Sequence, residues 1–156
     1  MLPAVARADT VDLAAAVGFG TGVSLAPGED GATIRRTPTF FDLDLAGALD
    51  IYPGWEWSLG VGVPFEGTPA LAFTPRVRRL VERWGVDVYV SAGVPAFVAP
   101  YTLVGLELGL GGRYPATESL EAFATAVADA YFAGSDLGPG GSLVMFNLLA
   151  GVRVPL

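Results

Sequence analysis

Apolar and polar side chains alternate along most of the chain with a period of two. Between residues 11 and 25, the odd positions carry mostly large apolar side chains, whereas the even positions carry Asp, Ala, Gly or Ser. Such alternation predicts a β-strand with one apolar face and one small or polar face. Seven segments show the pattern clearly: 11–25, 41–51, 55–65, 71–78, 86–94, 104–111 and 144–154.

An eighth segment, residues 120–132, fits two interpretations. Its alanines and the spacing of Leu120, Phe123 and Val127 suit an amphipathic helix, with Thr117 as a possible N-cap. At period two, its alanines instead form one face and larger side chains form the other. We favour a strand, because tertiary context overrides propensity and an eighth strand completes an even, closable set.

Short connections join these segments in two alternating sets. One set comprises residues 52–54, 79–85 and 114–119, and the other comprises 26–38, 66–69, 95–100 and 134–141. Eight strands joined in this way predict an all-β, up-and-down antiparallel meander. Closure of such a meander into a barrel removes its exposed edges.

The composition indicates apolar surroundings. Hydrophobic residues make up 52% of the 156 residues and charged residues only 16%, whereas soluble domains average about 25% charged residues. All nine basic residues are Arg, and the sequence has no Lys, Gln, His or Cys. These absences exclude a Ser-His triad, a Cys nucleophile, a zinc finger and a P-loop. The net charge of −7 argues against a nucleic-acid partner.

A transmembrane helix does not fit the sequence. Residues 88–106 form a charge-free span of the necessary length, but Pro95 and Pro100 would each interrupt helical hydrogen bonding.

The N-terminus carries a candidate export signal. Ala6-Arg7-Ala8 before Asp9 resembles the cleavage region of a secretory signal peptide. We therefore interpret residues 1–8 as a signal-peptide remnant or N-terminal tail, and residues 9–156 as a single barrel domain.

Two barrel types remain, since alternation alone does not say which face points inward. A soluble lipocalin-like barrel would enclose a small apolar ligand, whereas a membrane barrel turns its apolar face to lipid. Small residues with a few charges suit the narrow lumen of an eight-stranded barrel.

Aromatic residues near the strand ends predict two membrane-interface girdles. One girdle comprises Tyr52, Trp55, Trp57, Trp84 and Tyr114, and the other comprises Phe65, Phe73, Phe97, Tyr101 and Phe132, with Phe40 and Phe41 nearby. We therefore predict an eight-stranded antiparallel up-and-down transmembrane β-barrel with a polar, side-chain-filled lumen.

The chain resembles the small outer-membrane barrels of Gram-negative bacteria, of the OmpX and OmpA transmembrane-domain type. Gly151, Val154 and Leu156 resemble the C-terminal assembly signal of those barrels, although Leu149 replaces a usual polar residue and Leu156 a usual terminal aromatic. The resemblance implies an outer-membrane location with both termini periplasmic. It also implies contact with outer-membrane lipid and with the barrel-assembly machinery.

Charged residues on the lumenal face predict an ion network. Its expected members are Asp12, Asp50, Glu56, Arg76, Arg78, Asp87, Glu107, Arg113, Asp129 and Arg153. The expected partners are Arg78 with Asp87 and Glu56, and Arg153 with Asp12 and Asp129. Buried charges are costly unless paired, so the network is expected to plug the lumen.

Asp42 and Asp44 have glycines as neighbours on the flanking strands and are harder to explain. Four explanations remain for this pair: the carboxylates are hydrated, they pair across the lumen with Arg76, they share a proton, or they bind a cation.

The function expected from the sequence is structural or surface-interacting. The enzymatic barrels of this size depend on His with Ser, so a chain without His is expected to be a non-enzyme without a metal or other cofactor. Arg35 and Arg36, in the longest predicted loop, suit contact with lipopolysaccharide phosphates. A soluble ligand-binding barrel and a narrow outer-membrane channel remain as alternatives.

Overall fold

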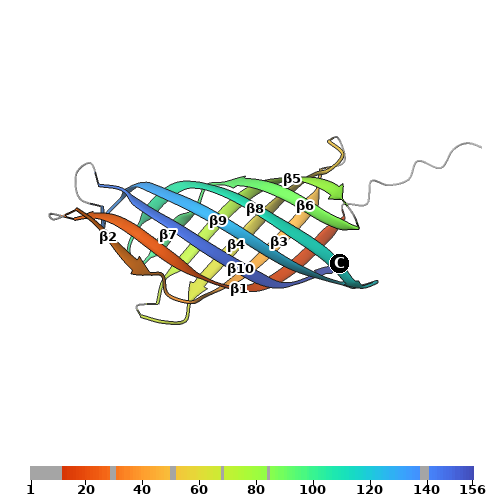
Figure 1. Ribbon diagram of the computed structural model, residues 1–156, viewed down its shortest axis with the longest axis horizontal. Helices are drawn as coiled ribbons and strands as arrows, with labels where there is room; N and C mark the ends of the chain where they lie inside the picture. Colours follow the sequence, from red (N-terminus) through yellow and green to blue (C-terminus); the bar gives the residue numbers. More distant parts are fainter. Residues whose placement is uncertain (1–11, 29–30, 50–51, 68, 84, 138–140) are drawn as a thin grey trace, which may run out of the picture.

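The computed structural model describes residues 12–28, 31–49, 52–67, 69–83, 85–137 and 141–156 (Figure 1). The described regular elements are ten β-strands. They are β1 (Leu13–Gly28), β2 (Gly31–Arg36), β3 (Phe40–Ala48), β4 (Trp55–Pro64), β5 (Leu71–Arg83), β6 (Val86–Gly93), β7 (Ala96–Ala99), β8 (Leu103–Thr117), β9 (Leu120–Gly134) and β10 (Leu143–Pro155). Within these ranges, no helix is long and apolar enough to cross a membrane.

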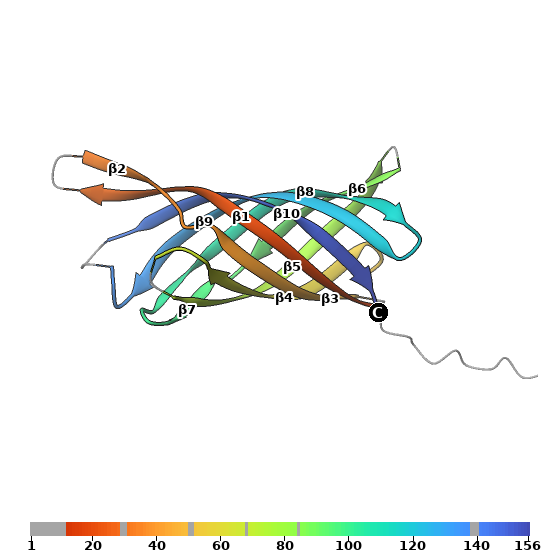
Figure 2. The ribbon, with the colours of Figure 1, turned by 90° about the horizontal axis from the view of Figure 1, so that it is seen from below.

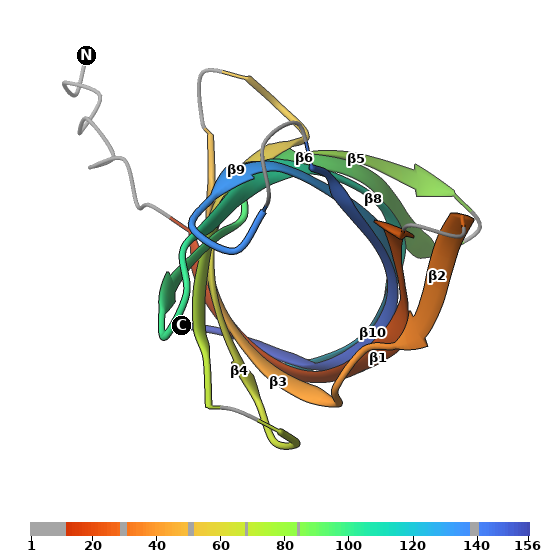
Figure 3. The same ribbon diagram turned by 90° about the vertical axis from the view of Figure 1, so that its left-hand side faces the viewer.

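The ten strands make eight staves of one closed barrel. β1 pairs with β2 along its second half and with β3 along its first half, so β2 and β3 form a single interrupted stave. β6 and β7 form another, since both pair with β5 and β8. Antiparallel pairing of β10 with β1 closes the ring seen end-on in Figure 3. The predicted eight-stranded barrel is confirmed, and β9 confirms that residues 120–132 form a strand.

The two ends of the barrel differ. The start of β1 and the C-terminus lie at one end, which we call the terminus end, whereas the β1–β2 hairpin projects from the other, the hairpin end (Figures 1 and 2).

Several predicted connections are wrong in extent, because strand pairing continues into them. β1 and β2 pair out to Gly28 and Gly31, inside the expected 26–38 loop. β5 and β6 pair as far as Arg83 and Val86.

Two further predicted connections also contain paired strand. β8 continues to Thr117, within the expected 114–119 turn, where it pairs with Leu120 at the start of β9. β7 occupies most of the expected 95–100 loop.

The apolar side chains face outward. On β8, Leu106, Leu108 and Leu110 are 58%, 67% and 58% exposed, whereas Glu107 between them is 3% exposed. The other buried polar side chains on the strands are Asp42, Asp44, Glu56, Ser58, Thr74, Ser91, Arg113, Asp129 and Asn147. The lipocalin-like alternative is therefore wrong, because it requires the apolar face to point inward.

Most of the described girdle aromatics lie on the outer surface at the two ends. Tyr52, Trp55 and Tyr114 are exposed near the terminus end, and Phe65, Phe73 and Phe132 near the hairpin end. Trp57 packs on the outer face over Gly47, its direct cross-strand partner. Trp84 lies outside the described residues.

Two predicted girdle residues are wrongly placed. Phe97 and Tyr101 pack against each other with ring centroids 5.5 Å apart. Phe97 also lies 5.6 Å from the ring of Tyr131, which points into the lumen and is 3% exposed. Both rings therefore line the lumen mouth. Phe97 lies on β7, on the face opposite to Val98, which is 49% exposed. Phe40 also lines this mouth.

Candidate functional site

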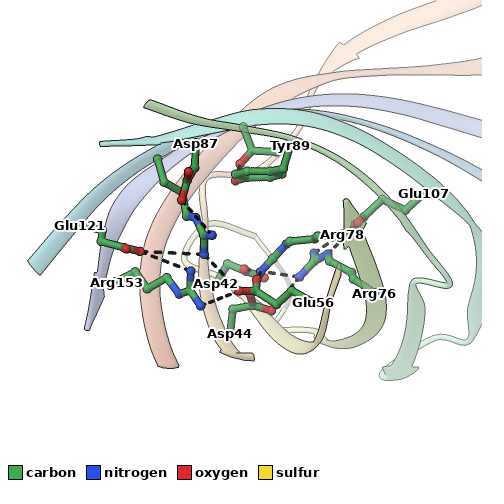
Figure 4. Close-up of polar contacts among 12 residues, drawn as sticks. Asp42, Asp44, Glu56, Arg76, Arg78, Asp87, Tyr89, Glu107, Glu121 and Arg153 are labelled. Atoms are coloured by element: carbon green, nitrogen blue, oxygen red, sulfur yellow. Dashed lines mark hydrogen bonds and ion pairs between the residues drawn. The ribbon is translucent and has the colours of Figure 1, made fainter. Parts of the chain in front are cut away.

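The terminus half of the lumen is crossed by a group of charged side chains, which we call the lower cluster (Figure 4). Its members are Glu56, Arg78, Asp87, Arg113, Glu121 and Arg153. They come from several staves and include three direct cross-strand pairs: Glu56 with Arg78, Asp87 with Arg113, and Glu121 with Arg153.

Glu56 is the centre of the lower cluster. Its carboxylate accepts hydrogen bonds from Arg78 Nη1 at 3.1 Å, Arg113 Nη1 at 3.1 Å and Arg153 Nη2 at 2.6 Å. Asp87 and Glu121 pair with these guanidinium groups from the other side. The lower cluster thus places three cations and three carboxylates across the lumen.

A second group, the middle cluster, lies beside the lower cluster toward the hairpin end and consists of Asp42, Asp44, Arg76 and Glu107. Arg76 donates to Glu107 through Nε at 2.6 Å and through Nη2 at 3.0 Å, a bidentate geometry that favours Arg. Its Nη1 lies 3.4 Å from Asp44 Oδ1 and 3.7 Å from Asp42 Oδ2. Arg78 Nη2 donates to Asp44 at 2.5 Å and joins the two clusters.

Glycines give Arg76 the space to make these contacts. Gly93 is the cross-strand partner of both Arg76 and Glu107, so no side chain stands between them. Gly60 is the partner of Asp44, and a Cβ at Gly60 would overlap Arg76 Nη1. The bare backbone at both positions lets one guanidinium reach carboxylates two staves away on either side.

The lumenal residues predicted from the sequence are largely brought together, but several of the expected partners are wrong. Asp87 pairs with Arg113, because Arg78 stands opposite Ser91, four residues beyond Asp87 on β6. Arg153 pairs with Glu56 and Glu121.

Neither expected partner of Arg153 is within its reach. Asp129 stands opposite Met145, eight residues away along β10. Asp12 is exposed ahead of β1. Asp50 lies outside the described residues.

Glu121, Tyr89 and Thr125 are among the polar residues of the lumen that were not predicted from the sequence as site residues. Glu121 belongs to the lower cluster, and alternation on 120–132 already placed it on the lumenal face. Tyr89 covers Arg78, whose Cζ lies 5.6 Å from the ring centroid, and its hydroxyl lies 2.5 Å from Thr125 Oγ1.

Asp42 and Asp44 are thus paired across the lumen, and unequally. Asp44 contacts both Arg76 and Arg78, whereas Asp42 pairs, among the described cations, with Arg76 alone, at 3.7 Å. In the part of the chain that the structure describes, no group of three or more His, Cys, Asp or Glu side chains is arranged to hold a metal.

A cavity of about 110 Å³ occupies the hairpin half of the lumen. Asp42, Arg76, Glu107 and Asp129 are the charged residues in its lining. On the terminus side of this charged layer the free space shrinks to a second cavity of about 30 Å³. The larger cavity is therefore a cup closed toward the terminus end by the two clusters.

Aromatic rings form the rim of this cup. Phe40, Phe97, Tyr101 and Tyr131 all line it. Burial raises the pKa of the Tyr101 hydroxyl, and the nearby Asp136 carboxylate adds to the rise. Tyr101 is therefore a neutral hydroxyl at the rim.

The predicted surface residues lie on two other parts of the molecule. Arg35 and Arg36 lie on β2 and are exposed, and Arg36 Nη2 lies 3.5 Å from Glu66 Oε1. Gly151, Val154 and Leu156 lie at the end of β10, where Val154 is 41% and Leu156 75% exposed.

Known structures share the fold of the chain. No family model matches the sequence, and no curated protein matches it. The structure of Neisserial surface protein A is 12% identical, with a TM-score of 0.65, over 92% of this chain and 99% of that one. The N-terminal β-barrel domain of Pseudomonas aeruginosa OprF is 16% identical, with a TM-score of 0.56, over 90% and 96%. A major outer membrane protein from Thermus thermophilus is 14% identical, with a TM-score of 0.54, over 91% and 99%. In fold, the chain is an eight-stranded β-barrel of the bacterial outer-membrane type.

Proposed function

We propose that this chain is an integral outer-membrane barrel with a structural or surface-interaction role and no catalytic activity. The observation that carries the proposal is the contrast between the two faces of each stave. Large apolar side chains cover the outside, while charged pairs fill the inside. Such a surface is stable in lipid, where backbone groups must be paired internally and a closed barrel leaves no open edge.

The lower cluster supports a plugged lumen. Glu56, Arg113 and Arg153 come from β4, β8 and β10, so their contacts span the interior of the barrel. A solute that passes this level would have to separate buried ion pairs, and breaking one such pair costs about 3–5 kcal/mol. A narrow channel is the competing function.

The β1–β2 hairpin is the candidate interaction surface. It projects past the rest of the hairpin end (Figure 2) and carries Ile34, which is 67% exposed, next to Arg35 and Arg36. In the proposed orientation the termini are periplasmic and this hairpin is outside the cell. The two arginines then lie at the level of the lipopolysaccharide phosphates. The end of β10 is the segment proposed to contact the assembly machinery.

Two measurements on one preparation test the proposal. The chain is folded in detergent, and boiled and unboiled samples are compared by gel electrophoresis. A heat-dependent shift in mobility is expected from a membrane barrel, and full solubility without detergent contradicts it. The folded barrel is then added to planar lipid bilayers. A silent bilayer is expected, and stepwise conductance contradicts the plugged lumen in favour of the channel.

A further inference from the structure

The cup at the hairpin end carries an excess of negative charge. Among the described residues, three carboxylates line it, on Asp42, Glu107 and Asp129, and Arg76 is the single cation in the lining. Arg76 is bidentate with Glu107 and also contacts Asp44 below. One guanidinium therefore contacts several carboxylates, and the lining of the cup carries more negative than positive charge.

Asp129 is the carboxylate with the poorest complement of partners. It is 6% exposed and stands directly opposite Glu107 on the neighbouring strand, a like-charged pairing that is unfavourable in a sheet. Its Oδ2 accepts a hydrogen bond from Asn147 Nδ2 at 3.2 Å. Its Oδ1 is buried and has no hydrogen-bond partner among the described residues. An orphaned buried acceptor of this kind costs free energy that a ligand can recover.

The remaining wall of the cup suits an apolar body. The Phe97 ring packs in tilted geometry against the rings of Tyr101 and Tyr131. Phe40, Met145 and Pro95 are among the other apolar residues of the lining. A single water needs roughly 10–15 Å³ of such space, so the cavity has room for several waters or for a short organic chain.

From this geometry we propose that the cup binds a small primary ammonium compound, with its charged end at Asp129 and its apolar chain along the Phe97 and Tyr101 rings. The orphaned acceptor at Asp129 requires a hydrogen-bond donor, which a primary ammonium group has and a quaternary one lacks. Aromatic faces near the entry further favour a cation. The ammonium charge offsets the second carboxylate of the Glu107–Asp129 pair.

The test uses n-butylammonium as the probe and the full chain folded in an uncharged sugar detergent. Two-dimensional NMR of the isotope-labelled barrel follows the signals of Thr37 and Asn147, which line the cup. We expect saturable shifts with n-butylammonium and much smaller ones with n-butanol, which has the same chain without the charge. Equal binding of the two probes, or no binding of n-butylammonium, would overturn the proposal.

Matched variants locate the site. Asp129→Asn is expected to weaken binding of n-butylammonium about tenfold or more, as loss of a charged hydrogen bond does. Asp87→Asn makes the same change at the other end of the lumen, outside the cup, and is expected to bind like the parent. If Asp129→Asn does not fold, Asp42→Asn removes another carboxylate of the cup and is expected to weaken binding as well. Parent-like binding by the cup variants, or equal weakening by Asp87→Asn, would contradict the site.

Discussion

Arg76 and Glu107 form a bidentate ion pair across a stave that separates them, with Nε–Oε1 and Nη2–Oε2 distances of 2.6 Å and 3.0 Å. The strand between them presents Gly93 at that level, so nothing intervenes. The side chains of Arg76 and Glu107 are 9% and 3% exposed. In addition to the pairs on neighbouring strands, the barrel interior thus contains contacts between staves that share no backbone hydrogen bonds.

Loss of Arg76 is expected to destabilise the barrel strongly. Arg76→Met leaves Asp42 and Glu107 without a cation partner and Asp44 with Arg78 alone. Breaking a buried pair in this way costs about 3–5 kcal/mol, measured as the free energy of unfolding in urea with the barrel in lipid vesicles. Arg36→Met is the control, because the Arg36–Glu66 pair is exposed and such pairs contribute about 0–1 kcal/mol. Equal losses in the two variants would contradict a structural role for the middle cluster.

Space at Gly60 is expected to be essential for the same contact. In Gly60→Ala the new Cβ would overlap Arg76 Nη1, so the guanidinium must move away from Asp42 and Asp44. We expect a loss of about 1–3 kcal/mol in unfolding free energy, the usual cost of overpacking.

Gly62 offers a matched control for Gly60 on the same face of β4. A Cβ at Gly62 would meet only the Ala72 Cβ, at 3.7 Å, which is ordinary contact. A Gly62→Ala variant as unstable as Gly60→Ala would show that the cost comes from the strand backbone and not from Arg76.

The apolar outer face is expected to be sensitive to charge only where it meets lipid. Leu108, in the middle of β8, and Ile34, on the projecting hairpin, are both 67% exposed. Leu108→Arg should cost about 2–4 kcal/mol in vesicles, as arginine does near the bilayer midplane, and Ile34→Arg about 0–1 kcal/mol. Similar small effects at both positions would indicate that water, not lipid, surrounds the barrel.

Removal of the hairpin arginines is expected to weaken lipopolysaccharide binding. Arg35→Ser with Arg36→Ser takes away two exposed cations suited to phosphate. We expect a several-fold loss of affinity in a surface-binding assay, because exposed ion pairs contribute about 0–1 kcal/mol each. Arg79→Ser, near the Tyr52–Gly54 turn at the terminus end, is the control. Unchanged binding in the double variant would remove the hairpin as the contact.

The period-two pattern was sufficient to predict the staves and to divide each into two faces, because alternation follows directly from strand geometry. The small and charged residues on one face and the aromatic residues near the strand ends then indicated which face points into the lumen. The partners of Arg153 could not be predicted, since strand tilt and stagger bring it to Glu56 and Glu121 while Asp129 lies eight residues further along β10.

Phe97 and the glycines show a second limit of sequence reasoning. Phe97 lies near a strand end like the true girdle residues, but it is on the face of β7 opposite to the exposed Val98 and packs against the lumenal Tyr131. Gly60 beside Asp44 gave no local sign that it was space for an arginine from another stave. The space at Gly60 depends on long-range geometry that a single strand does not encode.

The β1–β10 seam has a consequence for the timing of folding. The seam joins β1 to β10 through residue pairs that run from Ala14 with Pro155 to Leu25 with Val144. The first described strand therefore cannot complete its pairing before the last one is made. Until the ribosome has made β10, β1 presents an unpaired edge, and lipid does not tolerate open edges. At the proposed membrane location, insertion of the closed barrel therefore follows the synthesis of β10. The nascent chain, apolar on one side of every stave, depends until then on being kept apart from other chains.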